Sequence, residues 1–321
     1  MQTLLKKVQD IFASEQFLHE PKELYEPIDY TLRLGGKRIR PMLLLAANQM
    51  FNGDMEQVRH AAVGIETFHN FTLLHDDLMD KSPIRRGQPT VYRKWDENTA
   101  ILSGDTMFAL AWRYFLVQPH ARLQEILNCF NETAILVCEG QQYDMNFERR
   151  DDITIPEYMM MIRLKTAVLL AGALKIGALY ANAPEQDIDH IYEFGIHLGL
   201  AFQLQDDLLD SFGNVAEFGK QTGQDIRDNK KTYLFLSALQ SSPADLRREL
   251  LDLFASTPQN SDAKVERVLQ IYRQLDIRHQ VEEAIAKEFR DAVQHLDSIN
   301  TEETLKKPLR ELTTTLFGRK K

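Results

Sequence analysis

Residues 159–179 form a segment that is apolar on nearly every side of a helix, and this feature most limits the folds open to the chain. The segment also contains small residues that let neighbouring helices approach closely: Ala167, Ala171, Gly172, Gly177 and Ala178. A helix without a polar face has to be surrounded by other helices. The segment therefore belongs inside a large helical bundle.

Helix-period patterns extend over most of the 321 residues, whereas the alternation typical of half-buried strands is almost absent. Turn signals divide the chain into roughly ten helical stretches. We expect the breaks at Pro21, Pro27, 52–53, 82–83, 118–119, Pro156, 183–184, 212–223, 242–243 and Pro308. No composition shift or flexible linker separates the halves, so we predict one all-α domain over 1–321.

Composition and charge exclude several classes of protein. A net charge of -9 disfavours a nucleic-acid-binding surface, which needs an excess of Lys and Arg. The two cysteines, Cys129 and Cys138, would point to opposite sides of a helix, so we expect neither a disulfide nor a zinc site, and a reducing compartment such as the cytoplasm.

Lys6 and Lys7 interrupt the first apolar pattern, which favours an amphipathic helix over a signal peptide. The apolar runs are far shorter than the roughly 20 residues of a transmembrane helix, so we expect a soluble protein.

Two similar acidic clusters, LLHDDLMD at 73–80 and LQDDLLD at 204–210, lie within apolar helical stretches. Asp76 and Asp80 are four residues apart and share one helix face, as do Asp206 and Asp210. Like charges at this spacing repel, and carboxylates are seldom buried unless they are paired or bind a metal. A solvated helix face would explain one such cluster, but two within apolar helices indicate cation binding.

The oxygen-only donors predict which cation binds. Neither cluster has a His or Cys partner at metal-ligand spacing, so Mg²⁺ or Mn²⁺ is favoured over zinc. Mg²⁺ usually takes one or two carboxylates and completes its shell with water and substrate phosphate. The clusters therefore predict a phosphate-bearing substrate.

Basic residues are grouped in two segments, one before the first acidic cluster and one directly after it. GGKRIRP at 35–41 supplies Lys37, Arg38 and Arg40 beside two glycines that let backbone N–H groups approach an anion. After the first cluster, Pro83 ends the helix and Arg85 and Arg86 follow. Arginine suits bidentate phosphate contacts, so these residues are candidate phosphate ligands.

Three further signals have two readings each. His69 shares a helical stripe with Asp76 and Asp80, so it is either a substrate ligand or a core histidine bonded to the backbone. Lys165 lies among apolar residues, where it either meets an anion or extends to the surface. The loop GKQTGQDIRDNKK after the second cluster is either a phosphate-binding loop or a solvated one.

Five motifs in order, GGKRIRP, FTLLHDDLMDKSPIRRG, RLKT, FQLQDDLLD and GKQTGQDIRDNK, resemble the trans-isoprenyl diphosphate synthases, also called polyprenyl synthetases. The resemblance covers about residues 30–235 and is to the short-chain, farnesyl- or geranylgeranyl-producing type. It implies an isoprenoid-synthase-type bundle around a deep central cavity, and a homodimer. It also implies two substrates, isopentenyl diphosphate and an allylic diphosphate (dimethylallyl, geranyl or farnesyl).

The resemblance assigns a role to each matching residue. Magnesium would be held by Asp76, Asp80, Asp206 and Asp210, with Asp77 and Asp207 as weaker candidates. Isopentenyl diphosphate would be bound by Gly36, Lys37, Arg40, His69 and Arg86. The allylic diphosphate would be bound by Arg85, Lys165, Thr166, Gln203, Lys220 and Lys230. The catalytic group would comprise Lys165, Thr166, Gln203, Asp76, Asp80 and Asp206.

The implied reaction is a head-to-tail (1′-4) condensation by ionisation, condensation and elimination. Metal ions and cationic side chains stabilise the departing pyrophosphate, which lets the allylic C–O bond break. The isopentenyl double bond attacks the carbocation, and by resemblance the released pyrophosphate accepts the proton. The Lys165 carbonyl, the Thr166 hydroxyl and the Gln203 amide would supply dipoles near the cation.

Product length in this family is set by bulky residues just before the first acidic cluster. Phe71 and Thr72 occupy the fifth and fourth positions before Asp76. One aromatic residue of the two predicts a short product of C15 to C20, with C20 favoured.

Three alternative functions stay open. A class I terpene cyclase also has a DDxxD helix but handles one diphosphate, and a head-to-head synthase of the squalene type condenses two allylic substrates. Neither explains Lys37 and Arg40 well. A silent regulatory subunit would keep the fold for partner binding, but loss of Asp76, Asp206 or Lys165 would be expected, and all three are present.

Overall fold

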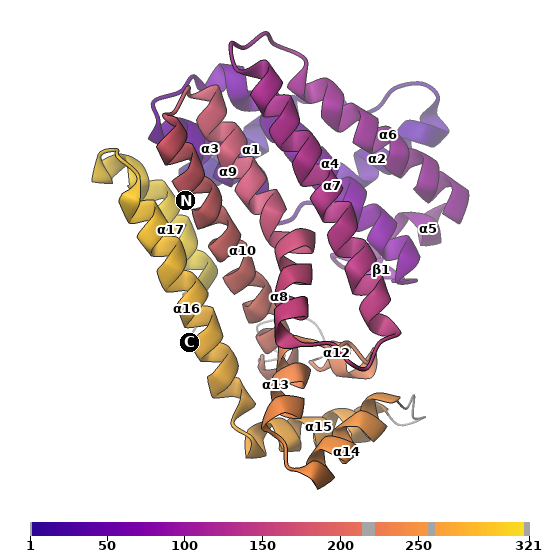
Figure 1. The fold of residues 1–321 in the computed structure, drawn as a ribbon. Helices are drawn as coiled ribbons and strands as arrows, with labels where there is room; N and C mark the ends of the chain where they lie inside the picture. Colours follow the sequence, from indigo (N-terminus) through magenta and orange to yellow (C-terminus); the bar gives the residue numbers. More distant parts are fainter. Residues whose placement is uncertain (1, 214–221, 256–260, 318–321) are drawn as a thin grey trace. The chain divides into compact units, whose positions relative to one another are not determined.

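A computed structural model describes residues 2–213, 222–255 and 261–317. The described chain is almost wholly helical (Figure 1), which confirms the all-α prediction. The chain divides into two compact units, each built from three separate segments. The first unit comprises 1–130, 172–189 and 300–312, and the second comprises 131–171, 190–299 and 313–321. A single domain over 1–321 stays a prediction.

The first unit holds most of the N-terminal elements. Its elements are α1 (Gln2–Ser14), α2 (Lys22–Arg33), α3 (Ile39–Met50), α4 (Met55–Met79), β1 (Ile84–Arg85), β2 (Gln88–Pro89), α5 (Val91–Lys94) and α6 (Glu97–Phe115). It also includes the first residues of α7 (Leu123–Glu148), most of α9 (Val168–Tyr180), the start of α10 (Glu185–Phe212) and most of α17 (Glu303–Phe317).

The second unit contains the remaining parts of these shared helices and the later elements of the chain. Its own elements are α8 (Ile155–Ile162), the π-helix η1 (Arg163–Ala167), α12 (Gln224–Arg227), α13 (Tyr233–Ser241), α14 (Ala244–Ala255), α15 (Ser261–Gln274) and α16 (Ile277–Ser298). None of the described helices is both long and apolar enough to cross a membrane.

The helix α4 is defined at both ends by local chemistry. The Asp54 carboxylate accepts a hydrogen bond from the Glu56 N–H at 2.9 Å, which satisfies a free donor at the helix start. At the other end, Asp80 is the C-cap and Lys81 adopts a positive φ of 53°, so the helix cannot continue. The first acidic cluster thus lies in the last turn of α4.

A short hairpin follows α4, although no strand was expected from the sequence. Ile84 pairs with Pro89 and Arg85 with Gln88 in antiparallel register. The turn residues Arg86 and Gly87 both have positive φ, 53° and 74°, which two-residue hairpin turns of this hand require. The hairpin fixes the backbone that carries Arg85 and Arg86.

Two of the predicted breaks are wrong. Pro27 lies inside α2 and Pro308 inside α17. A proline removes one backbone donor but leaves the rest of the helical ladder intact. Pro27 is itself buried beside Ile28 and Leu32, so burial of this face favours a continuous helix.

The apolar segment 159–179 is not one regular helix. It passes from α8 through η1 into α9. A Cβ on Gly140 would lie 2.2 Å from the Lys165 backbone nitrogen, so α7 packs directly against the wide π turn. Single π turns inside α-helices often occur at functional sites because they redirect side chains. Here the turn carries Lys165 and Thr166.

Candidate active site

The structure places the predicted site residues in two groups, one in each unit. In the first unit, the last three turns of α4 carry His69, Asp76 and Asp80, and the segment before α3 carries Gly36 and Lys37. In the second unit, η1 carries Lys165 and Thr166, and α10 carries Gln203 and the second acidic cluster. Each group is described by itself.

The backbone before α3 is shaped for close contact with Arg86. Gly35 and Gly36 have φ values of 79° and 120°, a region that side chains rarely adopt. A Cβ on Gly36 would lie 2.9 Å from the Arg86 guanidinium carbon. Arg86 also donates a hydrogen bond to the Gly35 carbonyl. The two glycines therefore allow the Arg86 guanidinium to lie against the start of α3.

Arg40 and His69 form a direct hydrogen bond. Arg40 Nη1 lies 2.9 Å from His69 Nε2, and because guanidinium can only donate, Nε2 has to be the acceptor. Burial and the positive charges of Arg40, Arg86, Arg85 and Arg38 hold the pKa of His69 well below its usual 6.5. His69 is therefore a neutral imidazole in this basic cluster.

The same basic cluster lowers the pKa of its arginines. Burial lowers the pKa of Arg40 to about 10, with Glu66 opposing this shift and Arg86 adding to it. Burial likewise lowers the pKa of Arg86. Both guanidinium groups remain charged at neutral pH. A group of cations this close together is stabilised by an anion, and guanidinium groups bind phosphate well.

Glu66 is a site residue that the sequence analysis missed. Its side chain is 2% exposed, and it accepts a 2.8 Å ion-pair bond from Arg38. Asn70 donates to Glu66 and in turn accepts a 3.5 Å contact from Arg86. Glu66 lies ten residues before Asp76 in the same helix, and a lone carboxylate in the apolar run 61–68 was the available sequence signal. Glu66 thus holds Arg38 directly and contacts Asn70, which in turn contacts Arg86.

Arg38 differs from its neighbours Lys37 and Arg40. It has a positive φ of 49°, and its side chain is buried against Glu66, the Leu32 carbonyl and the Phe12 ring. These contacts use the guanidinium inside the fold, so Arg38 is structural. Lys37 is exposed at the same loop.

The first acidic cluster contains carboxylates in different environments. Asp77 is 5% exposed, and its two carboxylate oxygens share the single Nε hydrogen of Arg85, at 2.9 and 2.8 Å from Nε. Asp76 is half-buried and Asp80 is exposed. Both lie at the C-terminal end of α4, where the helix dipole disfavours negative charge. A bound cation would offset this repulsion, so Asp76 and Asp80 fit a Mg²⁺ ion and Asp77 is already paired.

The pairing of Arg85 bears on its predicted role. Arg85 Nε is directed at Asp77, so the hairpin and the acidic cluster are joined by an ion pair. The two terminal nitrogens of the guanidinium keep further donor capacity. Binding of the allylic diphosphate by Arg85 stays a prediction.

Phe71 and Thr72 lie one turn before the first cluster. The Phe71 ring contacts Phe68, Phe108 and His75, with centroids 5.6, 5.4 and 4.8 Å away. Thr72 donates a 2.8 Å hydrogen bond to the His69 carbonyl, one turn back in α4. Phe71 is thus part of an aromatic group shared by α4 and α6.

In the second unit, a chain of hydrogen bonds joins η1, α8 and α10. Thr166 Oγ1 donates to Gln203 Oε1 at 3.0 Å, and Gln203 Nε2 donates to Asp207 Oδ1 at 3.0 Å. Tyr158 donates to the other Asp207 oxygen. The family resemblance assigned Thr166 and Gln203 to one site, and the structure brings their side chains into contact. Tyr158 is an additional member.

Lys165 is paired with an acid that sequence reasoning missed. Its Nζ lies 2.6 Å from Asp144 Oδ2 on α7. Both side chains are partly exposed, so Lys165 neither extends freely into solvent nor lies unpaired in the core. Asp144 has no obvious sequence signal, because it belongs to no acidic repeat.

The second acidic cluster contacts the segment that follows it. Asp210 accepts hydrogen bonds from the N–H groups of Gln224 and Asp225, at 3.2 and 3.0 Å. Burial raises the pKa of Asp207 to about 7. Burial and the charges of Asp207 and Asp210 raise the pKa of Asp225 to about 8. Carboxylates that are this costly to ionise fit a cation site, and Asp225 is a further candidate ligand.

Lys230 lies in this acidic neighbourhood. Its Nζ is 3.9 Å from Asp225 Oδ1, and its N–H donates to the Asp225 carbonyl at 2.9 Å. Lys231 is instead bonded to the carbonyls of 147, 148 and 150 and to Asp151. Substrate binding by Lys230 stays a prediction. Lys220 lies outside the described residues.

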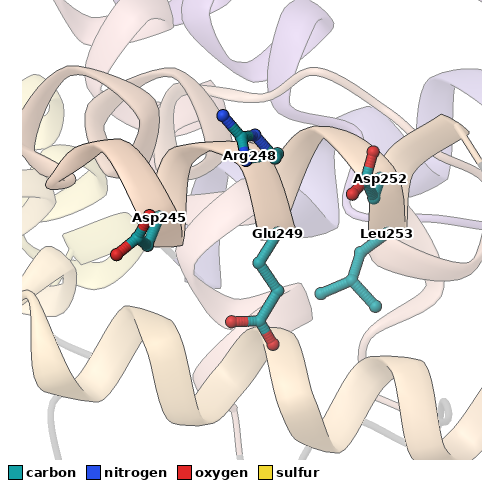
Figure 2. A pocket seen from close by; sticks show the side chains of 5 residues that line it. All are labelled: Asp245, Arg248, Glu249, Asp252 and Leu253. Carbon is teal, nitrogen blue, oxygen red and sulfur yellow. The ribbon is translucent and has the colours of Figure 1, made fainter.

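The surface pocket drawn in Figure 2 is unrelated to these groups. It is lined by Asp245, Arg248, Glu249, Asp252 and Leu253 of α14. Glu249 points toward α15, where it pairs with Arg267 at 2.5 and 2.8 Å. None of the lining residues is a predicted site residue.

The family model and similar known sequences identify the same protein family. The family model described as polyprenyl synthetase matches residues 21–272. A geranylfarnesyl diphosphate synthase of Natronomonas pharaonis is 40% identical over 277 residues, which are 80% of this chain and 79% of that protein. A geranylgeranyl diphosphate synthase of Saccharolobus solfataricus is 35% identical over 309 residues, covering 94% and 91% of the two chains.

Solved structures agree with these sequence matches. A crystal structure of a geranylgeranyl pyrophosphate synthase has a TM-score of 0.92 and 41% identity, and the match covers 100% of this chain and 98% of that one. The geranylgeranyl pyrophosphate synthetase of Pyrococcus horikoshii gives a TM-score of 0.89 at 29% identity, covering 99% and 96%. The chain therefore belongs to the polyprenyl synthetase family, among the short-chain trans-prenyl diphosphate synthases.

Proposed function

We propose that this prenyltransferase joins isopentenyl diphosphate to an allylic diphosphate and releases a C20 trans-prenyl diphosphate and pyrophosphate. One observation carries the proposal. Arg40 and Arg86 surround a neutral His69 on the same helix that carries Asp76 and Asp80. The first unit thus contains a group of basic side chains that could bind an anion without a metal. Two turns further along α4, it contains a carboxylate pair suited to a metal.

The basic cluster suits isopentenyl diphosphate. Arg40, Arg86 and the exposed Lys37 supply positive charge, and α3 presents its N-terminus to the same place. Helix N-termini and guanidinium groups both favour phosphate. A neutral His69 can also donate its Nδ1 hydrogen. Isopentenyl diphosphate does not ionise during the reaction, so a site built from fixed cations is sufficient for it.

The acidic clusters suit the allylic diphosphate. Asp76, Asp80, Asp206 and Asp210 would hold Mg²⁺, which as a bound Lewis acid stabilises charge on the pyrophosphate leaving group. Mn²⁺ has the same preference for oxygen ligands. Lys165, Lys230 and Arg85 would bind the remaining phosphate oxygens, as would Lys220. Asp225, whose carboxylate is costly to ionise without a cation, would support the second cluster.

The residues of η1 and α10 suit the carbocation. After the C–O bond breaks, positive charge develops on the allylic carbon and needs oriented dipoles rather than a base. The Thr166 hydroxyl and the Gln203 amide are already fixed by their mutual hydrogen bond. The backbone carbonyl of Lys165, which lies in the same π turn, would supply a further dipole. These groups would stabilise the cation until the isopentenyl double bond attacks and pyrophosphate takes the proton.

The C20 product is supported by Phe71 and by the names of relatives. Proteins named geranylgeranyl diphosphate synthase are 39% and 35% identical to this chain, and a geranylfarnesyl diphosphate synthase is 40% identical. Phe71 is held by neighbouring rings, so it could limit chain growth. The cytoplasmic location, the homodimer and the deep central cavity stay predictions.

The deciding experiment is a product analysis. Purified protein is incubated with labelled isopentenyl diphosphate and dimethylallyl, geranyl or farnesyl diphosphate in turn, with Mg²⁺ or with EDTA. We expect Mg²⁺-dependent condensation ending at C20, with Mn²⁺ as a partial substitute. A C25 end product would contradict the length assignment alone. Absence of condensation with every starter would contradict the function.

A further inference from the structure

We infer that the face between α10 and α16 is a binding site for a transition-metal ion such as Zn²⁺, Ni²⁺ or Co²⁺, held by His197, Glu288 and Asp291. Both helices belong to the second unit here, and they lie side by side (Figure 1). None of the three residues is a predicted site residue for prenyl transfer. The inference therefore stands independently of the proposed function.

The sequence aligns these donors on facing helix stripes. His190 and His197 are seven residues apart on α10, with Glu193 between them. Glu288, Asp291 and His295 follow the same three-and-four spacing on α16. Residues at this spacing lie on one face of a helix. His190 contacts His295 and His197 contacts Glu288, so the helices run antiparallel and the stripes face each other.

The geometry brings ligand atoms together. One ligand atom each from His197, Glu288 and Asp291 lie within 4.8 Å of one another. His197 Nδ1 is 2.7 Å from Glu288 Oε2. Ligands about 2.1 Å from a tetrahedral zinc are about 3.4 Å apart, a value between these two distances. Small side-chain rotations would complete three bonds to one ion and leave a fourth position for water.

The histidines next to this site are suited to its chemistry. His190 and His295 place their Nδ1 atoms 3.2 Å apart, so at most one of these nitrogens carries a hydrogen. The His295 ring stacks on His197 with centroids 5.6 Å apart and planes at 18°, which fixes the orientation of the ligand ring. Imidazole nitrogens together with carboxylates form a donor set that zinc and nickel prefer over magnesium.

The ammonium group of Lys287 already interacts with the carboxylates of Glu288 and Asp291. Lys287 Nζ lies 3.3 Å from Glu288 Oε1 and 3.0 Å from Asp291 Oδ2. The Lys287 side chain is 62% exposed, so it can turn into solvent at little cost. Glu288 is buried, and its carboxylate contacts both His197 and Lys287. The site thus holds two carboxylates beside an ammonium group that can move away from them.

The site is tested by metal titration of the full chain in excess Mg²⁺, which saturates oxygen-only sites. We expect one equivalent of Zn²⁺ to bind in calorimetry and Co²⁺ to give the strong visible absorption of a tetrahedral, nitrogen-containing site. His197→Gln and Asp291→Asn should each weaken Zn²⁺ binding at least about 100-fold. Loss of a residue that only hydrogen-bonds a metal ligand typically weakens binding by about 10- to 100-fold. His279→Gln, an exposed histidine of α16, is the matched control and should bind unchanged.

Lys287→Ala separates a metal site from a simple ion-pair cluster. Removing one competing charge about 4 Å away should tighten Zn²⁺ binding about fivefold. The inference is overturned if no saturable binding occurs below millimolar Zn²⁺, if His197→Gln binds as the parent does, or if Lys287→Ala leaves the affinity unchanged. Circular dichroism of each variant checks that the helices remain folded.

Discussion

Arg40 Nη1 lies 2.9 Å from Nε2 of His69, and this bond fixes the imidazole as a neutral acceptor among four arginines. The tautomer follows from the partner, because guanidinium has no lone pair to offer. The proton of His69 therefore resides on Nδ1, on the opposite side of the ring. The bond thus determines which hydrogen-bonding group His69 can present to a ligand.

His69 should not act as an acid or base at neutral pH. We expect His69→Gln to change the KM for isopentenyl diphosphate less than about threefold, since an amide also offers an acceptor and a donor. His69→Phe should raise that KM at least about tenfold, in line with the loss of hydrogen bonds to charged groups. Steady-state kinetics with each substrate varied in turn measures both. Equal effects of the two variants would contradict the hydrogen-bonding role.

The depressed pKa of His69 also predicts a pH dependence of stability. The unfolded chain binds a proton at His69 near pH 6.5 and the folded chain does so only at lower pH. The unfolded state therefore binds more protons between the two pKa values, and the free energy of unfolding falls as pH decreases through this range. Urea denaturation at several pH values should show a smaller decrease for His69→Gln than for the parent.

Glu66→Gln should destabilise the fold. The buried Arg38 guanidinium would lose its 2.8 Å partner, and breaking a buried ion pair costs about 3–5 kcal/mol. Glu56→Gln is the matched control, because its pair with Arg59 is at the surface and should contribute less than about 1 kcal/mol. Urea denaturation of both variants measures the difference. Equal midpoints would exclude a special role for Glu66.

Phe71→Ala should lengthen the product if Phe71 limits chain growth. Removal of a ring held by Phe68 and Phe108 opens space that an additional isoprene unit can fill. Phe71→Leu keeps much of the volume and should retain the parent product. Chromatography of the labelled products by chain length reports the outcome. An unchanged product from Phe71→Ala would remove this assignment.

Asp76→Asn should lower kcat by at least about 10³-fold, because electrostatic stabilisation of a leaving group is commonly the largest catalytic term. Added Mg²⁺ should not restore the rate. Asp105→Asn changes an exposed aspartate on α6 and should have little effect. EDTA should abolish the parent activity, and Mg²⁺ in excess should recover it. Near-normal turnover of Asp76→Asn would contradict metal binding by this residue.

Lys264 should act as a positioning residue for the loop that carries Lys230. Its side chain is 3% exposed, bonds to the Asn229 side chain and lies 5.2 Å from the Phe254 ring. Lys264→Met fills a similar volume but removes this bond to Asn229, so we expect a higher KM for the allylic substrate and an unchanged KM for isopentenyl diphosphate. Lys307→Met, at an exposed position, is the control. A rise in both KM values would indicate a general loss of structure.

The sequence alone determined the helical class, and it predicts the candidate site residues that belong to repeated or glycine-flanked motifs. Periodicity and the two acidic clusters are local signals, and spacing on a helix fixes which carboxylates share a face. The pairing of Thr166 with Gln203 was anticipated only through family resemblance, and the structure brings the two side chains into contact.

Only the tertiary structure decided which charged side chains are buried and which groups they pair with. Arg38 and Arg40 are two residues apart in one basic motif, yet Arg38 is buried against Glu66 and Arg40 faces His69. Glu66 in the first unit, and Asp144 and Tyr158 in the second, contact candidate residues of their own unit that are distant in sequence. The continuous helices through Pro27 and Pro308 were likewise not evident from local signals. Local sequence specifies what a backbone can form, whereas packing of distant segments sets which polar groups are buried together and must be paired.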